Sequence, residues 1–213
     1  MTSVAEMLER LREGGVQDAR VLEAMAAVPR EEFVLPGDRE EAYADRALSI
    51  GSNQTISQPL MVGIIVEALE LRAGDIALDI GTGSGYQAAV MAACGARVIS
   101  VERLPELANQ AAERLARLGV DVEVVATDGS LGLPDRAPFD AIAVGAAAPH
   151  LPVALARQLR EGGRLVVPVH SGIDGEELTR VRMRGGSWVT ENLGPCRFVP
   201  LIGAGGYRTV PFA

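Results

Sequence analysis

The sequence predicts an α/β fold in which helices cover both faces of a doubly wound, mostly parallel sheet. Short apolar segments alternate with helical patterns from residue 60 to residue 169, and a glycine-rich loop follows the first of these segments. Buried parallel strands are apolar throughout and are joined by crossover helices, which produces this alternation. The chain has 213 residues, of which 48% are hydrophobic, so it can bury a sizeable core. We therefore expect one domain over residues 1–213.

Residues 1–59 are expected to form a helical segment followed by an irregular loop. Apolar residues recur at helical spacing from Val4 until Gly14-Gly15 ends the helix. A second short helix follows and ends before Pro29. The pattern from there to Pro59 is irregular, and a long irregular segment in a compact domain usually has a function.

Residues 60–169 are expected to form the parallel part of the sheet, and residues 170–213 its antiparallel edge. The helices predicted for the parallel part are Met61–Leu71, a helix that follows the glycine loop and ends at Ala93, Pro105–Leu118 and Val153–Leu159. The parallel strands are predicted at Ile76–Ile80, Arg97–Val101, Val122–Ala126, Ala141–Val144 and Gly163–Val169. Three antiparallel strands are predicted at Leu178–Met183, Trp188–Leu193 and Phe198–Ile202.

Composition excludes several classes of protein. A net charge of −8 argues against a dedicated nucleic-acid or anionic-membrane binder, which needs a basic surface. All 20 basic residues are arginine, which excludes a Walker phosphate loop and a lysine Schiff base. Two distant cysteines and two histidines exclude a Cys/His zinc cluster, so no metal is expected. Without a signal peptide or an apolar run of about 18 residues, we expect a cytoplasmic protein. We also expect a monomer.

The glycine loop predicts the cofactor. Gly81, Gly83 and Gly85 let a ligand approach the backbone and the N-terminus of the following helix. A dinucleotide-binding G-x-G-x-x-G loop would need its third glycine at Tyr86. The loop is instead G-x-G-x-G preceded by Asp79, an arrangement associated with S-adenosyl-L-methionine methyltransferases. Asp79 can hold the ammonium group of that cofactor, either directly or through water.

Two further acidic positions follow predicted strands. Glu102 ends the second strand, where its carboxylate can accept both ribose hydroxyls, and Asp128-Gly129 follows the third strand, where it can meet the adenine edge. Ligands of such sheets bind outside the carboxyl ends of the strands, so these acids and Asp79 share one crevice. Each acid alone is equally compatible with a turn or surface role. Together, and in this order, they predict a nucleoside site.

The chain resembles the protein-L-isoaspartate (D-aspartate) O-methyltransferase family over nearly its full length. The glycine loop alone indicates only a methyltransferase, whereas the segment Gln54–Pro59 (Gln-Thr-Ile-Ser-Gln-Pro) is a hallmark of this family. The segments that carry the resemblance are Val28–Val34, Ile50-Gly51, Gln54–Pro59, Asp79–Gln87, Val101–Arg103, Asp128-Gly129, Ala137–Asp140, Gly162–Pro168 and Phe198–Gly203. Departures from the usual pattern occur at Ser49, Asn53, Leu60, Thr127 and Gly145.

The resemblance implies a protein repair enzyme. The family methylates the free carboxylate of L-isoaspartyl residues, which form when Asn or Asp cyclises to a succinimide; the labile ester recyclises and partly reopens as normal aspartate. Damaged proteins and peptides are thus the implied partners, and D-aspartyl residues are possible substrates. The resemblance places the catalytic role on Ser57. It places cofactor contacts on Thr55, Ile56, Ser57, Gln58, Ser84, Glu102, Asp128 and Gly129, beside the loop residues Asp79, Gly81, Gly83 and Gly85.

The residues suit this chemistry. A carboxylate is already ionised at neutral pH, so its methylation needs positioning and no general base. The Ser57 hydroxyl can donate a hydrogen bond to one acceptor oxygen without neutralising it. Ser57 also precedes Gln58-Pro59 and a predicted helix, so a helix-capping role is the alternative interpretation of this residue.

Two other functions remain open from the sequence. Relatives of this family methylate an aspartate of one dedicated peptide as tailoring enzymes, and we take the lack of a leader-binding extension as favouring repair. A nicotinamide oxidoreductase or an inert nucleotide-binding module is the alternative from another class. Tyr86 at the third glycine position counts against the oxidoreductase, and the intact set of acids counts against the inert module.

Overall fold

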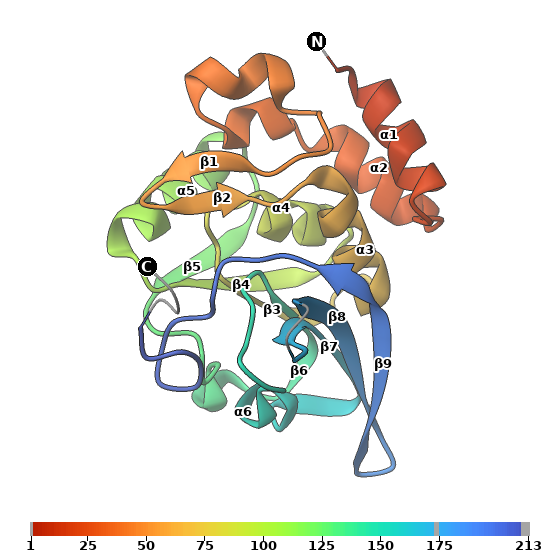
Figure 1. The fold of residues 1–213 in the computed structure, drawn as a ribbon, viewed down its shortest axis with the longest axis vertical. Coiled ribbons are helices and arrows are strands. Elements are labelled where there is room, and N and C mark those ends of the chain that lie inside the picture. The colour runs from red at the N-terminus through yellow and green to blue at the C-terminus, as the bar shows by residue number, and fades with distance from the viewer. Residues whose placement is uncertain (1, 173–174, 210–213) are drawn as a thin grey trace.

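The computed structural model describes residues 2–172 and 175–209, and Figure 1 shows their arrangement. A seven-stranded sheet has the order β5-β4-β3-β6-β7-β8-β9. Its strands are β3 (Ile76–Ile80), β4 (Arg97–Glu102), β5 (Val122–Ala126), β6 (Phe139–Val144), β7 (Leu159–His170), β8 (Glu176–Arg184) and β9 (Ser187–Cys196). The first five of these strands are parallel, and β8 and β9 form an antiparallel edge. This arrangement confirms the predicted fold class.

Helices cover both faces of the sheet because each strand sends alternate side chains to opposite sides. Ala77 of β3 joins a core with the N-terminal helices, whereas its neighbour Leu78 joins a second core with α6. The helices of the chain are α1 (Val4–Glu13), α2 (Ala19–Ala27), α3 (Pro59–Leu69), α4 (Tyr86–Ala93), α5 (Pro105–Arg117) and α6 (Val153–Ala156). Three short 3₁₀ helices are η1 (Arg30–Phe33), η2 (Pro36–Glu41) and η3 (Pro134–Arg136).

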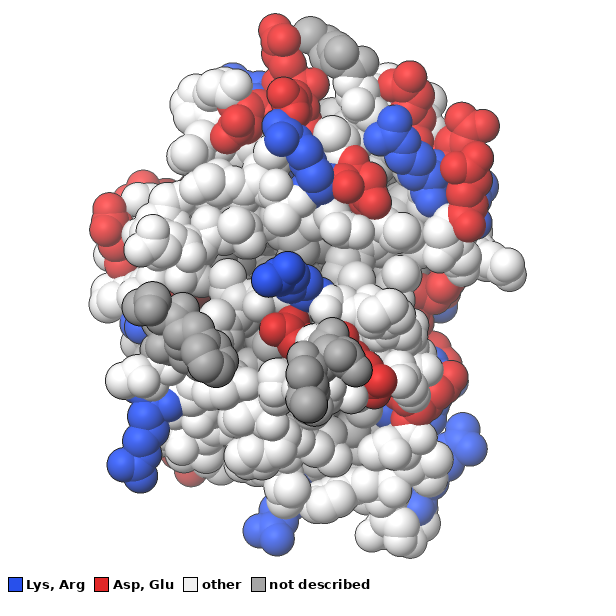
Figure 2. Space-filling model, in the orientation of Figure 1, with Lys and Arg blue, Asp and Glu red and all other residues white. Residues whose placement is uncertain are grey.

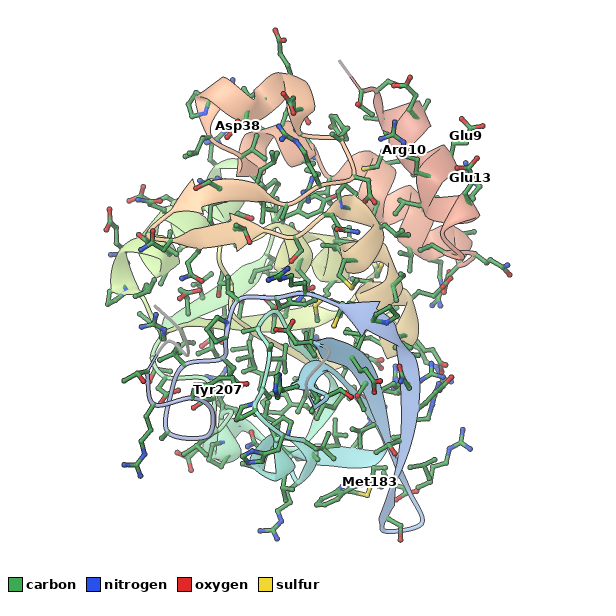
Figure 3. All side chains as sticks on the ribbon, in the orientation of Figure 1. Glu9, Arg10, Glu13, Asp38, Met183 and Tyr207 are labelled. Atoms are coloured by element: carbon green, nitrogen blue, oxygen red, sulfur yellow. The ribbon has the colours of Figure 1, made fainter. Side chains whose placement is uncertain are left out.

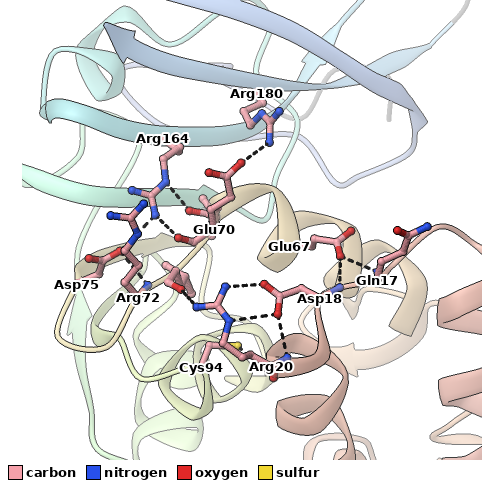
Figure 4. A network of polar contacts seen from close by, with 12 residues as sticks. Gln17, Asp18, Arg20, Glu67, Glu70, Arg72, Asp75, Cys94, Arg164 and Arg180 are labelled. Atoms are coloured by element: carbon pink, nitrogen blue, oxygen red, sulfur yellow. Dashed lines mark hydrogen bonds and ion pairs between the residues drawn. The ribbon is translucent and has the colours of Figure 1, made fainter.

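The end of α3 connects the N-terminal helices to the sheet through polar contacts, which Figure 4 shows. The Glu67 carboxylate accepts hydrogen bonds from the backbone N–H groups of Gln17 and Asp18 at 2.7 and 2.5 Å, just before α2 begins. The Arg20 guanidinium, paired with Asp18, donates to the carbonyl of Leu71 at 2.7 Å. The predicted N-terminal helical segment therefore forms, and α3 fixes its position.

The irregular segment before α3 contains a β-hairpin that the sequence analysis missed. β1 (Leu48–Gly51) and β2 (Gln54–Ile56) pair antiparallel around Ser52 and Asn53, whose φ angles are 51° and 55°. Positive φ at both central residues is typical of tight hairpin turns, and Asn tolerates it well. The Ser-Asn pair was the available signal, but strands of three and four residues are too short to show clear alternation.

Two other predictions about the second half of the chain were wrong. Residues 198–202 do not form a sheet strand: Pro200 makes an isolated parallel bridge with Ala147, and the segment lies outside the sheet order. The helix predicted at Val153–Leu159 ends at Ala156, because the Gln158 side chain turns back to hydrogen-bond the carbonyls of Ala154 and Leu131. β7 consequently begins at Leu159, earlier than predicted.

Within residues 2–172 and 175–209, no helix has the length and apolar character needed to cross a membrane. In the same part of the chain, no cluster of three His, Cys, Asp or Glu side chains could hold a metal ion.

Arg164 on β7 offers a test of how the sheet is attached to α3. Arg164 and Asp75 are each 6% exposed. The Arg164 guanidinium donates to the carbonyls of Leu69 and Glu70 at 2.5 Å and lies 3.2 Å from the Asp75 carboxylate. We expect Arg164→Ala to lower the free energy of unfolding in urea by about 3 kcal/mol. Asp75 would stay buried with only the Arg72 backbone N–H at 3.1 Å and the more distant Arg160 guanidinium at 3.9 Å as partners. The exposed Arg157→Ala should change it by less than about 0.5 kcal/mol. Equal effects of the two substitutions would contradict this account.

Candidate active site

The glycine loop lies where the strand order of the sheet reverses. β3 is flanked by β4 on one side and by β6 on the other, and ligands of open α/β sheets bind in the crevice at such a point. The φ angles of Gly81, Gly83 and Gly85 are 92°, 51° and 92°. Residues other than glycine rarely adopt such positive values. A Cβ atom on Gly145, just after β6, would lie 3.3 Å from the Gly81 carbonyl oxygen. The loops after β3 and β6 therefore meet almost backbone to backbone.

Glu102 lies at the carboxyl end of β4 and faces this crevice. Its two carboxylate oxygens accept backbone N–H groups from Gly83 and Leu104, each at 3.0 Å. The side chain is 7% exposed and lines a cavity. Because each carboxylate oxygen can accept more than one hydrogen bond, Glu102 fixes the glycine loop and still has capacity for ligand hydroxyls.

Asp79 is buried beneath the loop. Its oxygens accept hydrogen bonds from Ser100 Oγ at 2.7 Å and from Gln87 Nε2 at 2.8 Å. Burial raises the pKa of Asp79 from 3.8 to about 6, although these hydrogen bonds oppose the increase. Gln87 lines a cavity beside the loop and Asp79 does not. The carboxylate thus reaches this cavity through the amide of Gln87.

Asp128-Gly129 connects the end of the parallel sheet to the C-terminal segment. The Asp128 carboxylate accepts the backbone N–H groups of Ser130 and Ala204 at 2.9 and 2.8 Å. Burial opposes ionisation, but the hydrogen bonds outweigh it and lower the pKa of Asp128. Gly129 packs against Val101, where a Cβ atom would lie 2.9 Å from a methyl carbon. Gly129 lines the same cavity as Glu102, whereas Asp128 does not line it.

Three adjoining cavities make up the site. The strand-end cavity, of about 550 Å³, lies between Glu102, Gly129 and Leu201. The glycine-loop cavity, of about 360 Å³, lies between Ser84 and Ile56. The outer cavity is the largest, about 1140 Å³, and includes Gln58, Met61 and the stretch Pro195–Val199 in its wall.

The hairpin residues predicted for the site line these cavities. Thr55 and Gly145 line all three, so the cavities meet at this pair. Ser57 lines both the glycine-loop cavity and the outer cavity. Ile56 faces only the first of these two and Gln58 only the second. The structure therefore brings the glycine loop, Glu102 and the 55–58 segment to one place.

Ser57 does not cap α3. The N-cap residue is Gln58, which makes no capping hydrogen bond with its side chain. The Asp45 carboxylate supplies the cap from elsewhere in the chain by accepting the Leu60 backbone N–H at 2.9 Å. Among the described residues, nothing hydrogen-bonds the Ser57 hydroxyl, which leaves it available to the cavities that it lines.

Arg30, for which the sequence analysis proposed no role, holds the backbone of Ser57 in place. Its Nη2 donates to the Ser57 carbonyl and its Nε to the Ala42 carbonyl, both at 2.6 Å. The guanidinium lies 4.7 Å from the centre of the Tyr86 ring, at the start of α4. The side chain is fully buried, and burial lowers the pKa of Arg30. Arg30 thus connects the hairpin segment to the helix that follows the glycine loop.

The C-terminal segment after β9 also lines the cavities, which the sequence analysis did not predict. Val199, Leu201 and Ile202 form part of the wall of the strand-end cavity. The backbone of Tyr207, labelled in Figure 3, returns to donate a hydrogen bond to the Leu201 carbonyl at 2.8 Å. An apolar run interrupted by Pro200 was the only available signal, and it also fits a strand.

Comparison with known proteins identifies the family. A family model described as protein-L-isoaspartate (D-aspartate) O-methyltransferase matches residues 2–206. The chain belongs to this family. Among similar proteins, the protein-L-isoaspartate O-methyltransferase of Methanoculleus marisnigri is 50% identical over 205 residues, covering 95% of this chain and 93% of that protein. Protein-L-isoaspartate O-methyltransferase 2 of Pelobacter propionicus is 52% identical over 201 residues, covering 93% and 89%.

Solved structures of isoaspartate methyltransferases have the same fold. One from Plasmodium falciparum, described as a complex with S-adenosyl-L-homocysteine, is 27% identical, with a TM-score of 0.81 over 95% of this chain and 99% of that one. Another protein-L-isoaspartate O-methyltransferase has a TM-score of 0.84 at 29% identity, covering 96% of this chain and 67% of that one. The likeness therefore includes the N-terminal helices and the C-terminal segment of this methyltransferase as well as the sheet.

The raised pKa of Asp79 predicts a pH-dependent effect on stability. Its pKa of about 6 in the folded protein exceeds 3.8, so this group favours the unfolded state increasingly as pH rises from about 4 to above 6. The difference corresponds to about 3 kcal/mol. Asp79→Asn removes this charge. The free energy of unfolding of the variant minus that of wild type should therefore increase by about 3 kcal/mol between pH 4 and pH 7.5.

Urea unfolding at the two pH values measures this change. Asp135→Asn, an exposed position in η3, is the matched control for a general loss of negative charge. A difference between Asp79→Asn and wild type that is the same at both pH values, or that decreases as pH rises, would contradict the proposed electrostatic cost of Asp79.

Proposed function

We propose that this enzyme transfers a methyl group from S-adenosyl-L-methionine to the free carboxylate of L-isoaspartyl residues in damaged proteins. The resulting ester recyclises to a succinimide, which can reopen as normal aspartate. The observation that carries the proposal is the meeting of the three cavities at Thr55 and Gly145, with Ser57 lining two of them. A cofactor site and an acceptor site on either side of Ser57 are what a methyl transfer needs.

The residues present fit S-adenosyl-L-methionine. We assign its nucleoside half to the strand-end cavity, where the Glu102 carboxylate faces apolar walls, and its amino-acid half to the glycine-loop cavity, where Gln87 extends from Asp79. The proposed cofactor contacts are Thr55, Ile56, Ser57, Gln58, Asp79, Gly81, Gly83, Ser84, Gly85, Glu102, Asp128 and Gly129. Of these, Asp79 and Asp128 act through their hydrogen-bond partners.

The reaction requires the acceptor carboxylate to be positioned against the methyl group. The cofactor supplies the methyl group as an electrophile on a positively charged sulfur. The acceptor carboxylate is ionised at neutral pH and attacks with one oxygen, so no residue has to remove a proton. Ser57, with its backbone held by Arg30, can donate a hydrogen bond to the other oxygen and fix the angle of attack. Correct orientation of two reactants can contribute about 7–11 kcal/mol to the barrier reduction.

We further propose that the chain acts as one domain and as a cytoplasmic monomer, on protein and peptide substrates and on neither nucleic acid nor membranes. The net charge of −8 supports the last point, because phosphate-rich partners attract basic surfaces. Use of D-aspartyl residues is also part of the proposal, in line with the description of the matching family model.

Selectivity for the isoaspartyl isomer is the main prediction. Isoaspartyl and aspartyl residues both offer one carboxylate, but it lies one bond from the peptide-bearing carbon in the first and one methylene further in the second. A misplacement of about 1 Å can cost on the order of 10²-fold in rate. In assays with methyl-labelled cofactor, the isoaspartyl form of a peptide should be methylated at least about 10²-fold faster than the aspartyl form. Equal rates would instead support a tailoring enzyme that methylates normal aspartate.

The role of Ser57 predicts a separate effect on turnover. Ser57→Ala should lower kcat by about 10- to 100-fold, below or at the lower end of what positioning donors contribute. Cofactor affinity should fall less than kcat, because the hydroxyl is assigned to the acceptor carboxylate. The melting temperature should stay close to wild type, because the hydroxyl caps no helix. Ser49→Ala, an exposed hydroxyl of the same hairpin, is the matched control and should leave kcat unchanged. A normal kcat for Ser57→Ala would remove the hydroxyl from the mechanism.

A further inference from the structure

The outer cavity contains an arginine that the proposed mechanism does not use. Among the described residues that line this cavity, Arg197 is the only one with a charged side chain. The others are apolar or small, apart from the polar side chains of Thr55, Ser57 and Gln58. In Figure 2, one group of basic atoms lies near the centre of the face in view, with acidic atoms next to it. A cation therefore faces the cavity that the acceptor must enter.

The backbone on both sides of Arg197 is fixed. Cys196 ends β9 in register with Glu176 of β8. The Glu176 carboxylate accepts the Phe198 backbone N–H at 2.6 Å, and the Val199 carbonyl accepts the Ala147 N–H at 2.8 Å. Arg197 itself is exposed, and within residues 2–172 and 175–209 no ion pair engages its guanidinium. Arg197 is thus an exposed residue on a fixed segment that lines the outer cavity.

The rest of the enzyme carries the wrong charge for an anionic acceptor. With 28 acidic and 20 basic residues, the chain has a net charge of −8, which disfavours the approach of a carboxylate. Glu102, Asp79 and Asp128 add negative charge on the cofactor side of Thr55. An acceptor carboxylate that leaves water for this site therefore needs a local cation, and a planar guanidinium suits a carboxylate well.

We propose that Arg197 is a specificity-determining residue that recognises the charge of the acceptor carboxylate. The inference rests on the proposed function, because it assigns the acceptor to the outer cavity. Methylation converts the anionic acceptor into a neutral ester, so the attraction to Arg197 acts on the substrate and is lost in the product. Arg197 thereby favours substrate binding and promotes release of the ester, while Ser57 orients the attack.

This role predicts a division between KM and kcat. The carboxylate loses charge as the new bond forms, so a cation that holds it stabilises the bound substrate at least as much as the transition state. Such an interaction lowers KM and does not raise kcat. Arg197→Gln should therefore raise KM for an isoaspartyl peptide by about tenfold, in line with a charge-assisted hydrogen bond, and leave kcat unchanged or higher.

Calorimetry provides a test that does not depend on turnover. The enzyme, saturated with S-adenosyl-L-homocysteine, is titrated with an isoaspartyl peptide and with the same peptide carrying a neutral carboxamide in place of the acceptor carboxylate. Wild type should bind the acid about tenfold more tightly than the amide, and Arg197→Gln should reduce this ratio to near one. Arg197→Lys should restore part of it. Arg157→Gln, an exposed arginine outside the three cavities, should retain the wild-type ratio.

The outcomes separate this inference from the proposed function. If Arg197→Gln keeps the wild-type ratio, or loses affinity for acid and amide equally, Arg197 does not recognise the charge, although methylation of isoaspartyl peptides would still support the proposed function. If wild type neither binds nor methylates the isoaspartyl peptide, the proposed function itself is wrong. Unchanged affinity for S-adenosyl-L-homocysteine shows in each case that the variant is folded.

Discussion

The active site depends on one buried cation. Arg30 donates to the carbonyls of Ser57 and Ala42 and lies against the ring of Tyr86, which also contacts Phe33 edge-on at a centroid distance of 5.4 Å. A fully buried guanidinium is costly unless its surroundings are well ordered, so its presence requires the hairpin segment and the start of α4 to keep one relative position. Residues of both elements line the glycine-loop cavity. Arg30 therefore determines the geometry that the cofactor and the acceptor both meet.

This rigidity suits a reaction that needs no proton transfer. The enzyme has two histidines in the whole chain, and the groups at the junction of the cavities are the hydroxyls of Thr55 and Ser57 and the backbone of Gly145. In the proposed arrangement, acidic residues lie on the cofactor side and an arginine lies on the acceptor side. Isoaspartyl and aspartyl residues have the same charge, so the enzyme must distinguish them by the position of the carboxylate. This requires the acceptor to be held in a fixed position.

Much of this could be predicted from the sequence. The continuous apolar strands and the glycine loop specified the parallel sheet, and the order of Asp79, Glu102 and Asp128 along the strand ends specified the crevice. Such local patterns depend on residues close together in the chain, which is why they are readable. The family resemblance added Ser57, which composition and spacing alone would have made a helix cap.

The remaining features depend on contacts between distant segments. Asp45 caps α3 from 15 residues before Leu60, so nothing next to Ser57 shows that its hydroxyl is free of that role. Arg30 contacts Ser57, which lies 27 residues later in the chain. The pattern of the apolar run at 198–202 indicated a strand, but these residues line a cavity instead. The orientation of Asp79 away from the cavity also follows from Ser100, which lies on the neighbouring strand. Tertiary packing decided each of these.

A crystal structure of the enzyme with S-adenosyl-L-homocysteine and an isoaspartyl peptide tests the central claim most directly. The account predicts the nucleoside in the strand-end cavity, the homocysteine in the glycine-loop cavity, and the peptide in the outer cavity. It also predicts the acceptor carboxylate within hydrogen-bond distance of the Ser57 hydroxyl, about 2.7 Å. A peptide bound outside the outer cavity, or a carboxylate that makes no contact with Ser57, would contradict it.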